Sequence, residues 1–247
     1  MGAVMPKTGA PVHAGPRLAS RGDFTVIDCA SCGFAHAMPL PDEAALSTVY
    51  SHDYYATEKP LYLERYEQDR AWWLDVYADR LATVEAATGI RGGTALDIGC
   101  GPGLFLDAAR DRGWRVEGIE PSRQAAAHAR GLGHAVHDGF FDPAMAATLA
   151  PVDLIHMALV LEHLPDPAAI LSTARGLLKP GGAVCVVVPN DFNPLQAAAL
   201  QQGVEPYWVA PPHHLNYFTP HSLGRLLQAC GFAVVERTAT FRWSCSC

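Results

Sequence analysis

No apolar run in this chain approaches the roughly 18 residues that a membrane-spanning helix needs. The opening stretch MGAVMPKTGAPVHAGPR lacks the apolar core of a secretion signal, and Pro6 stands where a myristoylation signal requires Ser or Thr. Of the 247 residues, 49% are hydrophobic and 17% are charged, which is typical of a soluble globular protein. We therefore expect a cytoplasmic protein with no membrane partner.

Clusters of basic residues are absent as well. Lys and Arg number 18 against 25 Asp and Glu, which gives a formal net charge of -7, and the cations are scattered singly. Binding along a phosphate backbone requires a basic stripe, so nucleic acid is not an expected partner. The 7 cysteines are an odd number spread along the chain, unlike the framework of a small secreted domain, and we expect reduced thiols.

The first 50 residues do not share the regular pattern of the rest. Residues 1–23 are rich in Gly, Ala and Pro and predict a loosely ordered arm. The stretch FTVIDCASCGFAHAMPLPD then predicts a short strand and a Cys-x-x-Cys-Gly knuckle at Cys29 and Cys32. A structural zinc site needs four ligands, and this knuckle supplies two. The residues that could complete the set are His13, His36, Cys245 and Cys247. We favour a metal-free segment that is held by packing.

From residue 51 onward, helical and strand-like patterns alternate. Apolar and aromatic spacing predicts one long amphipathic helix over residues 61–88. The strand-like runs that follow are TALDIG, RVEGIE, HAVHD, VDLIHMAL, AVCVVVP and, after a capped helix in TPHSLGRLLQACGF, AVVERTATF. Helices are expected between them at about 104–111, 122–132 and 167–178. Short connections and repeated crossovers predict a doubly wound, mostly parallel sheet.

A glycine turn follows the first strand of this sheet, in LDIGCGPGLFL. Its glycines Gly99, Gly101 and Gly103 are spaced G-x-G-x-G, and Leu104 stands where a dinucleotide fingerprint needs its third glycine. The turn also lacks the Lys-Ser/Thr pair of a P-loop. Both patterns disfavour NAD and ATP as ligands.

Two acidic residues give the positive argument. Asp97 lies at the mouth of the turn, where a carboxylate repels a pyrophosphate but attracts a ligand that carries an ammonium and a sulfonium. S-adenosylmethionine carries both charges. Glu120 ends the second strand, where doubly wound sites place an acid that accepts hydrogen bonds from ribose hydroxyls.

Four motifs in order, LDIGCGPG, VEGIEPS, VDLIHMALVLEHLPDP and LLKPGGAVCVVVPN, resemble those of class I S-adenosylmethionine-dependent methyltransferases over about residues 50–241. The resemblance implies a Rossmann-like α/β fold: a doubly wound, mostly parallel, seven-stranded sheet in an α/β/α sandwich, with a small N-terminal extension. It divides the chain into an arm and degenerate zinc-ribbon-like segment, 1–50, and a methyltransferase domain, 51–247. The cofactor-binding residues it implies are Asp97, Gly99, Gly101, Glu120, Pro121, Asp138, Gly139 and Phe140.

The resemblance also suggests where a methyl acceptor binds. His163, in LEHLPDP after the fourth strand, is the candidate base, and the alternative is a histidine that packs the turn. His214 lies in PPHHLNYFT, which is similar to a stretch that leads into the helix after the acceptor loop in such enzymes, and this makes His214 a second candidate site residue that lines or hydrogen-bonds the acceptor. Leu215 and Phe218 are expected to anchor that loop. An earlier aromatic cluster, expected as a lid or as plain packing, comprises Tyr50, Tyr54 and Tyr55.

Two features depart from the family pattern. Related N-terminal ribbons begin with a cysteine pair, and here Met5 and Thr8 stand in its place. Family members also end in an antiparallel hairpin, so either TATFRWSCS closes the sheet or the sheet is incomplete. We expect methyl transfer to a hydroxyl, amine or activated carbon of a secondary metabolite or sugar. The alternatives are aminopropyl transfer and a non-catalytic subunit that binds S-adenosylmethionine; the oligomeric state stays open.

Overall fold

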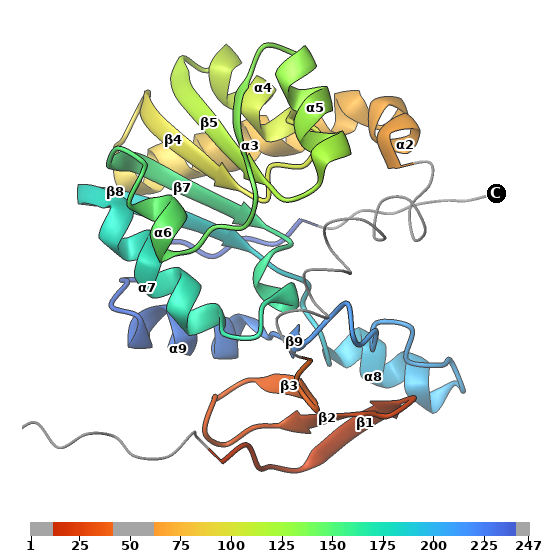
Figure 1. Ribbon diagram of the computed structural model, residues 1–247. Helices are drawn as coiled ribbons and strands as arrows, with labels where there is room; N and C mark the ends of the chain where they lie inside the picture. The colour runs from red at the N-terminus through yellow and green to blue at the C-terminus, as the bar shows by residue number, and fades with distance from the viewer. Residues whose placement is uncertain (1–11, 42–61, 241–247) are drawn as a thin grey trace, which may run out of the picture.

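The strand that precedes the glycine turn belongs to the larger of two β-sheets (Figure 1). This computed structural model describes residues 12–41 and 62–240, and within them five parallel strands stand in the order β6-β5-β4-β7-β8. Their bounds are β4 Gly93–Ile98, β5 Trp114–Glu120, β6 Ala135–Asp138, β7 Val152–Ala158 and β8 Leu178–Val187. Because all five run the same way, their carboxyl ends meet at one edge, where such sheets bind ligands.

Helices cover both faces of this sheet. The helices of the described residues are α2 Tyr62–Gln68, α3 Arg70–Thr88, α4 Leu104–Asp111, α5 Arg123–Gly131, α6 Pro143–Ala146, the 3₁₀ helix η2 Leu161–His163, α7 Pro167–Leu177, α8 Pro194–Gln201 and α9 Pro220–Ala229. Of these, α8 lies beside the smaller sheet and does not cover this one (Figure 1). Side chains alternate along the strands, so Ala95 and Leu154 pack with α3 and α4, whereas Leu96 and Ile155 pack with α7 and α9 on the opposite face (Figure 1). The predicted α/β/α sandwich is confirmed.

The predicted number of seven strands is not confirmed. The stretch AVVERTATF, predicted as the last strand, forms no strand over residues 233–240, so that prediction is wrong for the part of the stretch that the structure describes. A strand needs a partner strand to which it is hydrogen-bonded. Among the described residues β8 pairs only with β7, and residues 233–240 form no ladder along its other edge. The closing strand proposed in TATFRWSCS runs past residue 240 and so lies largely outside the described residues.

The long helix predicted over residues 61–88 is also wrong. The chain forms α2 and α3 instead, separated at Asp69, whose φ of -94° and ψ of 7° are not helical. Arg70, directly after this turn, reaches Asp107 of α4 at 2.6 Å. The end of α3 follows the prediction, because Gly89 takes the left-handed conformation with φ 75°.

A second, antiparallel sheet joins the N-terminal segment to a distant strand. Its order is β1 Arg17–Arg21, β2 Phe24–Asp28, β3 Ala35–Met38 and β9 Asn216–Tyr217. The expectation of a loosely ordered arm is therefore wrong for residues 17–21, because a two-residue turn at Gly22 and Asp23 folds β1 back onto β2. Pairing of Ala35 with Tyr217 ties this segment to the chain that follows β8.

Several expectations fall outside the described residues. These concern the domain boundary at residue 50, the tyrosines Tyr50, Tyr54 and Tyr55, the ribbon positions Met5 and Thr8, and the terminal cysteines Cys245 and Cys247. Within residues 12–41 and 62–240, no helix is long and apolar enough to cross a membrane.

One buried carboxylate joins the helices beside the glycine turn. Asp107 of α4 accepts hydrogen bonds from Arg70 and Arg110, each at 2.6 Å, and lies 2.8 Å from Nε2 of His134. Burial raises the pKa of Asp107, but the hydrogen bonds from Arg70 and His134 outweigh burial and hold that pKa below its usual range. The carboxylate therefore stays charged and links α3, α4 and the end of α5.

Replacing this carboxylate should destabilise the fold. We expect Asp107→Asn to lower the free energy of unfolding by about 1.5–3 kcal/mol, because hydrogen bonds to a charged group are lost. Urea unfolding at pH 7 measures the change. Asp111→Asn, at the exposed end of the same helix, is the matched control and should stay within about 0.5 kcal/mol of the native protein. Equal losses in both variants would contradict the role of Asp107.

Candidate active site

The glycine turn between β4 and α4 is tight because three glycines take positive φ. Gly99, Gly101 and Gly103 have φ values of 74°, 53° and 98°, which favour glycine. A Cβ atom on Gly99 would lie 2.7 Å from Cγ2 of Val160, so the turn also packs against the end of β7. The backbone N–H groups at 99 and 100 donate to the carbonyl of Ile119, at 2.8 and 3.1 Å. These bonds fix the turn against β5.

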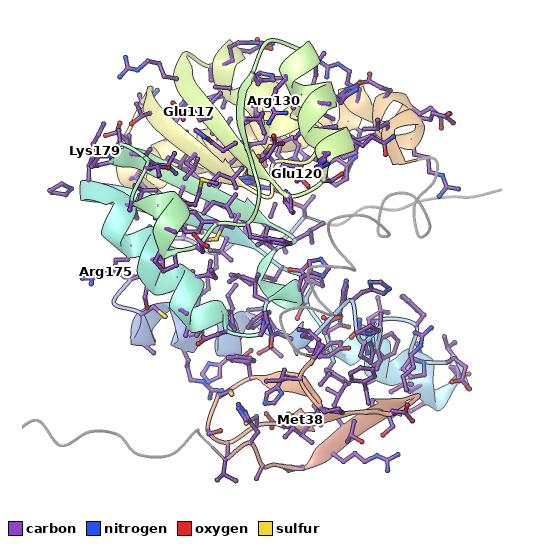
Figure 2. The ribbon with its side chains drawn as sticks, in the orientation of Figure 1. Met38, Glu117, Glu120, Arg130, Arg175 and Lys179 are labelled. Carbon is purple, nitrogen blue, oxygen red and sulfur yellow. The ribbon has the colours of Figure 1, made fainter. Side chains whose placement is uncertain are left out.

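Glu120, at the end of β5, faces this turn (Figure 2). Its side chain is only 2% exposed, and its carboxylate accepts hydrogen bonds from the backbone N–H groups of Gly101, at 2.9 Å, and Ser122, at 2.8 Å. Burial raises the pKa of Glu120 to about 7, and the nearby charge of Asp97 adds to this, while the two backbone donors oppose it. A carboxylate has about four acceptor positions, so two remain for a ligand.

Asp97 is held by a histidine that the sequence did not single out. Asp97 on β4 is paired in register with His156 on β7, and its Oδ1 lies 2.7 Å from Nδ1 of that ring. Arg80 of α3 donates to the opposite ring nitrogen, Nε2, at 2.9 Å. Because Nε2 accepts, the neutral ring carries its proton on Nδ1 and donates it to Asp97. The ring of His156 also stacks on Phe105, with centroids 3.8 Å apart.

A signal for His156 was present in the sequence. It is the one ionisable residue in the apolar middle of VDLIHMAL, and polar groups in such strands are hydrogen-bonded when buried. Which residue it would contact depended on the register between β4 and β7, which the sequence does not state. Complete burial lowers the pKa of His156, although the charge of Asp97 opposes the shift, so the ring is neutral at pH 7.

One large cleft opens at the carboxyl edge of the sheet. Its volume is about 2470 Å³, larger than the roughly 300–1,000 Å³ of a single ligand pocket, and it continues along β8 toward residues 231–240. The predicted site residues that line it are Asp97, Gly99, Gly101, Glu120, Pro121, Gly139, Phe140, His163 and His214. The structure thus brings all but one of the predicted residues to a single cleft.

The exception is Asp138. It lies at the end of β6, half exposed, outside the cleft lining, and pairs with Arg130 of α5 at 2.7 Å. The sequence placed it near the site only through the loose motif HDGFF. Its neighbour Phe140 does reach the cleft and is 44% exposed there. An exposed ring beside a crevice is suited to stacking on a flat group.

His163 has a defined protonation pattern. It ends the 3₁₀ helix η2, and its Nδ1 lies 2.7 Å from the backbone carbonyl of His213. A carbonyl can only accept, so Nδ1 carries the proton and the neutral ring presents Nε2 as an acceptor. The ring of His214 lies edge-on to it, with centroids 5.0 Å apart, and Glu162 is 3.9 Å from Nε2. The pattern on His163 suits a general base.

Asn216 holds this corner of the cleft together. Its side-chain amide donates to the carbonyls of Leu161, at 2.8 Å, and Leu164, at 2.6 Å, at the two ends of η2. Leu215 and Phe218 on either side are buried, as expected for anchors of this loop. The sequence did not single out Asn216, whose role depends on a contact across about 50 residues.

The comparisons with known proteins indicate one family. A family model described as a methyltransferase domain matches residues 66–237, which is more than half of the chain. The protein therefore belongs to this family of methyltransferase domains.

Curated relatives match the same part of the chain. A ubiquinone biosynthesis O-methyltransferase of Caulobacter vibrioides is 33% identical over 168 residues, which covers 61% of this chain and 66% of the relative. The protein of the same name from Aeromonas salmonicida is 30% identical over 158 residues, covering 59% and 65%. In both cases the chain spans just under two thirds of the relative's length.

Solved structures share the fold. A SAM-dependent methyltransferase of Thermotoga maritima gives a TM-score of 0.54 at 20% identity, over 74% of this chain and 81% of that one. Magnesium protoporphyrin IX methyltransferase from Synechocystis PCC 6803, solved with bound SAH, gives 0.57 at 14% identity, over 79% and 91%. The likeness shows that the sheet and its helices are those of a Rossmann-like methyltransferase fold.

The buried His156 should make stability depend on pH. Below pH 6.5 the unfolded chain binds a proton that the folded ring resists, so the free energy of unfolding should fall as pH falls through 6.5 and level off above it. The slope contributed is up to about 1.4 kcal/mol per pH unit. In His156→Gln, whose amide can still donate to Asp97, this contribution should vanish in urea unfolding from pH 5 to 8. His137→Gln, at a half-exposed ring on β6, is the control. Identical slopes for native protein and His156→Gln would refute the assignment.

Proposed function

We propose that this protein transfers a methyl group from S-adenosylmethionine to a small molecule. The observation that carries the proposal is the convergence, in one cleft, of the glycine turn, two buried carboxylates and a histidine, His163, whose Nδ1 is fixed by a backbone carbonyl. We assign the reaction to residues 51–247 and a supporting role to residues 1–50. The family match over residues 66–237 supports the first assignment, and the pairing of β3 with β9 supports the second.

The residues of the cleft fit the proposed cofactor. S-adenosylmethionine supplies an electrophilic methyl group on a positive sulfur, and its amino group is a second cation. Asp97 and Glu120 offer negative charge and acceptor oxygens at the carboxyl edge, whereas a pyrophosphate would be repelled by both. Glu120 would accept from ribose hydroxyls, and the exposed ring of Phe140 is suited to the flat base.

The chain has little covalent chemistry to perform in such a transfer. The protein must align the nucleophile with the methyl group, exclude water and remove a proton where the acceptor carries one. His163 would take that proton on Nε2, because its Nδ1 is already engaged with the carbonyl of His213. Asn216 keeps η2, and with it His163, in place.

The acceptor belongs to the class of small molecules with a hydroxyl, amine or activated carbon, such as a secondary metabolite or a sugar. Among these we favour oxygen. The curated relatives are named ubiquinone biosynthesis O-methyltransferases, and an oxygen acceptor gives His163 a proton to remove. Turnover with any acceptor would exclude the alternative of a subunit that binds the cofactor without catalysis.

Cofactor binding is tested at Glu120. S-adenosylhomocysteine should bind stoichiometrically and raise the melting temperature, and Glu120→Ala should weaken its affinity by about 10- to 100-fold in calorimetry, since a charged acceptor is lost. Affinity for the native protein should fall as pH falls through about 7, because ribose hydroxyls donate to the ionised carboxylate. This pH dependence should be absent from Glu120→Ala.

Glu117→Ala is the matched control. Glu117 lies on the same strand as Glu120 but at a different point along it (Figure 2). It is exposed and contacts His137, so its removal should leave the affinity unchanged. A response to NADH with none to S-adenosylmethionine or S-adenosylhomocysteine would overturn the proposed cofactor.

Proton removal is tested at His163. With acceptors bearing hydroxyl, amine or activated-carbon groups, and turnover followed by S-adenosylhomocysteine release, His163→Ala should lower kcat by about 10²- to 10⁴-fold and leave cofactor affinity nearly unchanged. Raising the pH should partly restore the rate, because an acceptor that ionises by itself needs no base. If the variant instead weakens cofactor binding and keeps its saturated rate, His163 is a structural residue and His214 is the next candidate.

A further inference from the structure

Four side chains of the N-terminal sheet converge on one point away from the cleft. Cys29 and Cys32 come from the knuckle between β2 and β3, His36 from β3, and His13 from the chain before β1. One nitrogen or sulfur atom from each lies within 4.8 Å of the others. Cys29 and His36 are almost fully buried, so these atoms are withdrawn from water.

The distances among these atoms match a tetrahedral ion. Zinc–sulfur bonds of about 2.3 Å and zinc–nitrogen bonds of about 2.0–2.1 Å place two nitrogens about 3.3 Å apart and a nitrogen and a sulfur about 3.6 Å apart. In the structure Nδ1 of His13 lies 3.1 Å from Nε2 of His36, 3.4 Å from Sγ of Cys32 and 3.7 Å from Sγ of Cys29. Ordinary packing does not require this spacing.

The tautomer of His36 points the right atom inward. Its Nδ1 lies 3.1 Å from the carbonyl of Ala37, which can only accept, so Nδ1 carries the proton. The lone pair of the neutral ring is then on Nε2, the atom that faces His13. A histidine that binds a metal is commonly fixed in this way through its other nitrogen.

The knuckle is also shaped for two ligands. Gly33 takes a φ of 76° and its N–H donates to the carbonyl of Cys29 at 2.8 Å, which turns the chain so that both thiols face the same side. A cavity of about 20 Å³ beside the cluster is lined by His13, Cys32, Phe34, His36, Leu40, Pro165 and Asn216.

We propose that Nδ1 of His13, Sγ of Cys29, Sγ of Cys32 and Nε2 of His36 bind one zinc ion. Two thiolates neutralise a divalent cation, and this mixed sulfur and nitrogen set in tetrahedral array is the one that zinc favours. Four protein ligands leave no open position, so the ion is structural. The sequence favoured a metal-free segment because it showed one cysteine pair, and His13 and His36 reach the knuckle only through the fold.

A zinc ion here would also stabilise the corner of the cleft that Asn216 holds together. His36 is paired with Asn216 across β3 and β9, and Asn216 holds both ends of η2. The metal therefore fixes a strand whose partner positions His163. This consequence rests on the proposed function, but the metal site itself does not.

Elemental analysis of the full-length protein tests the site. After expression with added zinc, about one zinc per chain should survive desalting, and Cys29→Ser, Cys32→Ser and His36→Ala should each lower this content by about tenfold or more. Cys230→Ser, which changes a half-buried cysteine at the end of α9, is the matched control and should keep its zinc. Zinc content that stays unchanged in the ligand variants would overturn the proposal.

If the ligand variants fail to fold, a measurement on the native chain still tests the site. Protein treated with a chelator and titrated with cobalt(II) should bind about one equivalent, with the visible bands of tetrahedral cobalt and the near-ultraviolet charge transfer of a thiolate ligand. Zinc should displace the cobalt and remove both bands. An octahedral spectrum, or no thiolate band, would refute the assignment, as would a Cys29–Cys32 disulfide in protein purified under reducing conditions. None of these readouts depends on methyl transfer.

Discussion

Asp97 and Glu120 are both almost fully buried, at the ends of adjacent parallel strands, and each has to replace the water it loses on folding. No lysine or arginine provides a direct ion pair to either carboxylate among the described residues. Backbone N–H groups compensate Glu120, and the neutral ring of His156 compensates Asp97. The tight turn places the N–H of Gly101 against Glu120, and the β4–β7 register places His156 against Asp97. Both carboxylates therefore remain at the carboxyl edge of the sheet without a basic side chain paired to them among the described residues.

The compensation links the cleft to the helical layer behind the sheet. His156 accepts a hydrogen bond from Arg80 of α3 and stacks on Phe105 of α4. Asp107, two residues further along α4, accepts a hydrogen bond from Arg70 and contacts His134. A change in how α3 packs would therefore alter the donor that Asp97 receives. The helices of this face thus stabilise the charge distribution of the site in addition to covering the sheet.

Local chemistry could be predicted from the sequence, and long-range pairing could not. The turn at Gly99 and the acid Glu120 were predictable because a strand, a glycine turn and a helix form one contiguous unit. His156 and Asn216 were missed because each acts through a partner more than 50 residues away. The sequence named His13 and His36 as possible partners of the knuckle, but it could not show that their ring nitrogens lie close to the two thiols. The predicted seventh strand rested on a family pattern that the described residues do not complete.

Because β3 pairs with β9, the small sheet cannot be completed until late in the synthesis of the chain. Ala35 and Tyr217 are 182 positions apart (217 minus 35), so β3 leaves the ribosome long before its neighbour exists. Until then one edge of the small sheet is open, and an open strand edge is a template for wrong pairing with other chains. The late strand β9 contributes only two residues to this sheet. The rest is formed by β1, β2 and β3, which are contiguous in sequence and can pair before β9 is made. The first three strands of the N-terminal sheet can therefore fold early, while the corner of the cleft that Asn216 holds forms only after residues 216–217 have been synthesised.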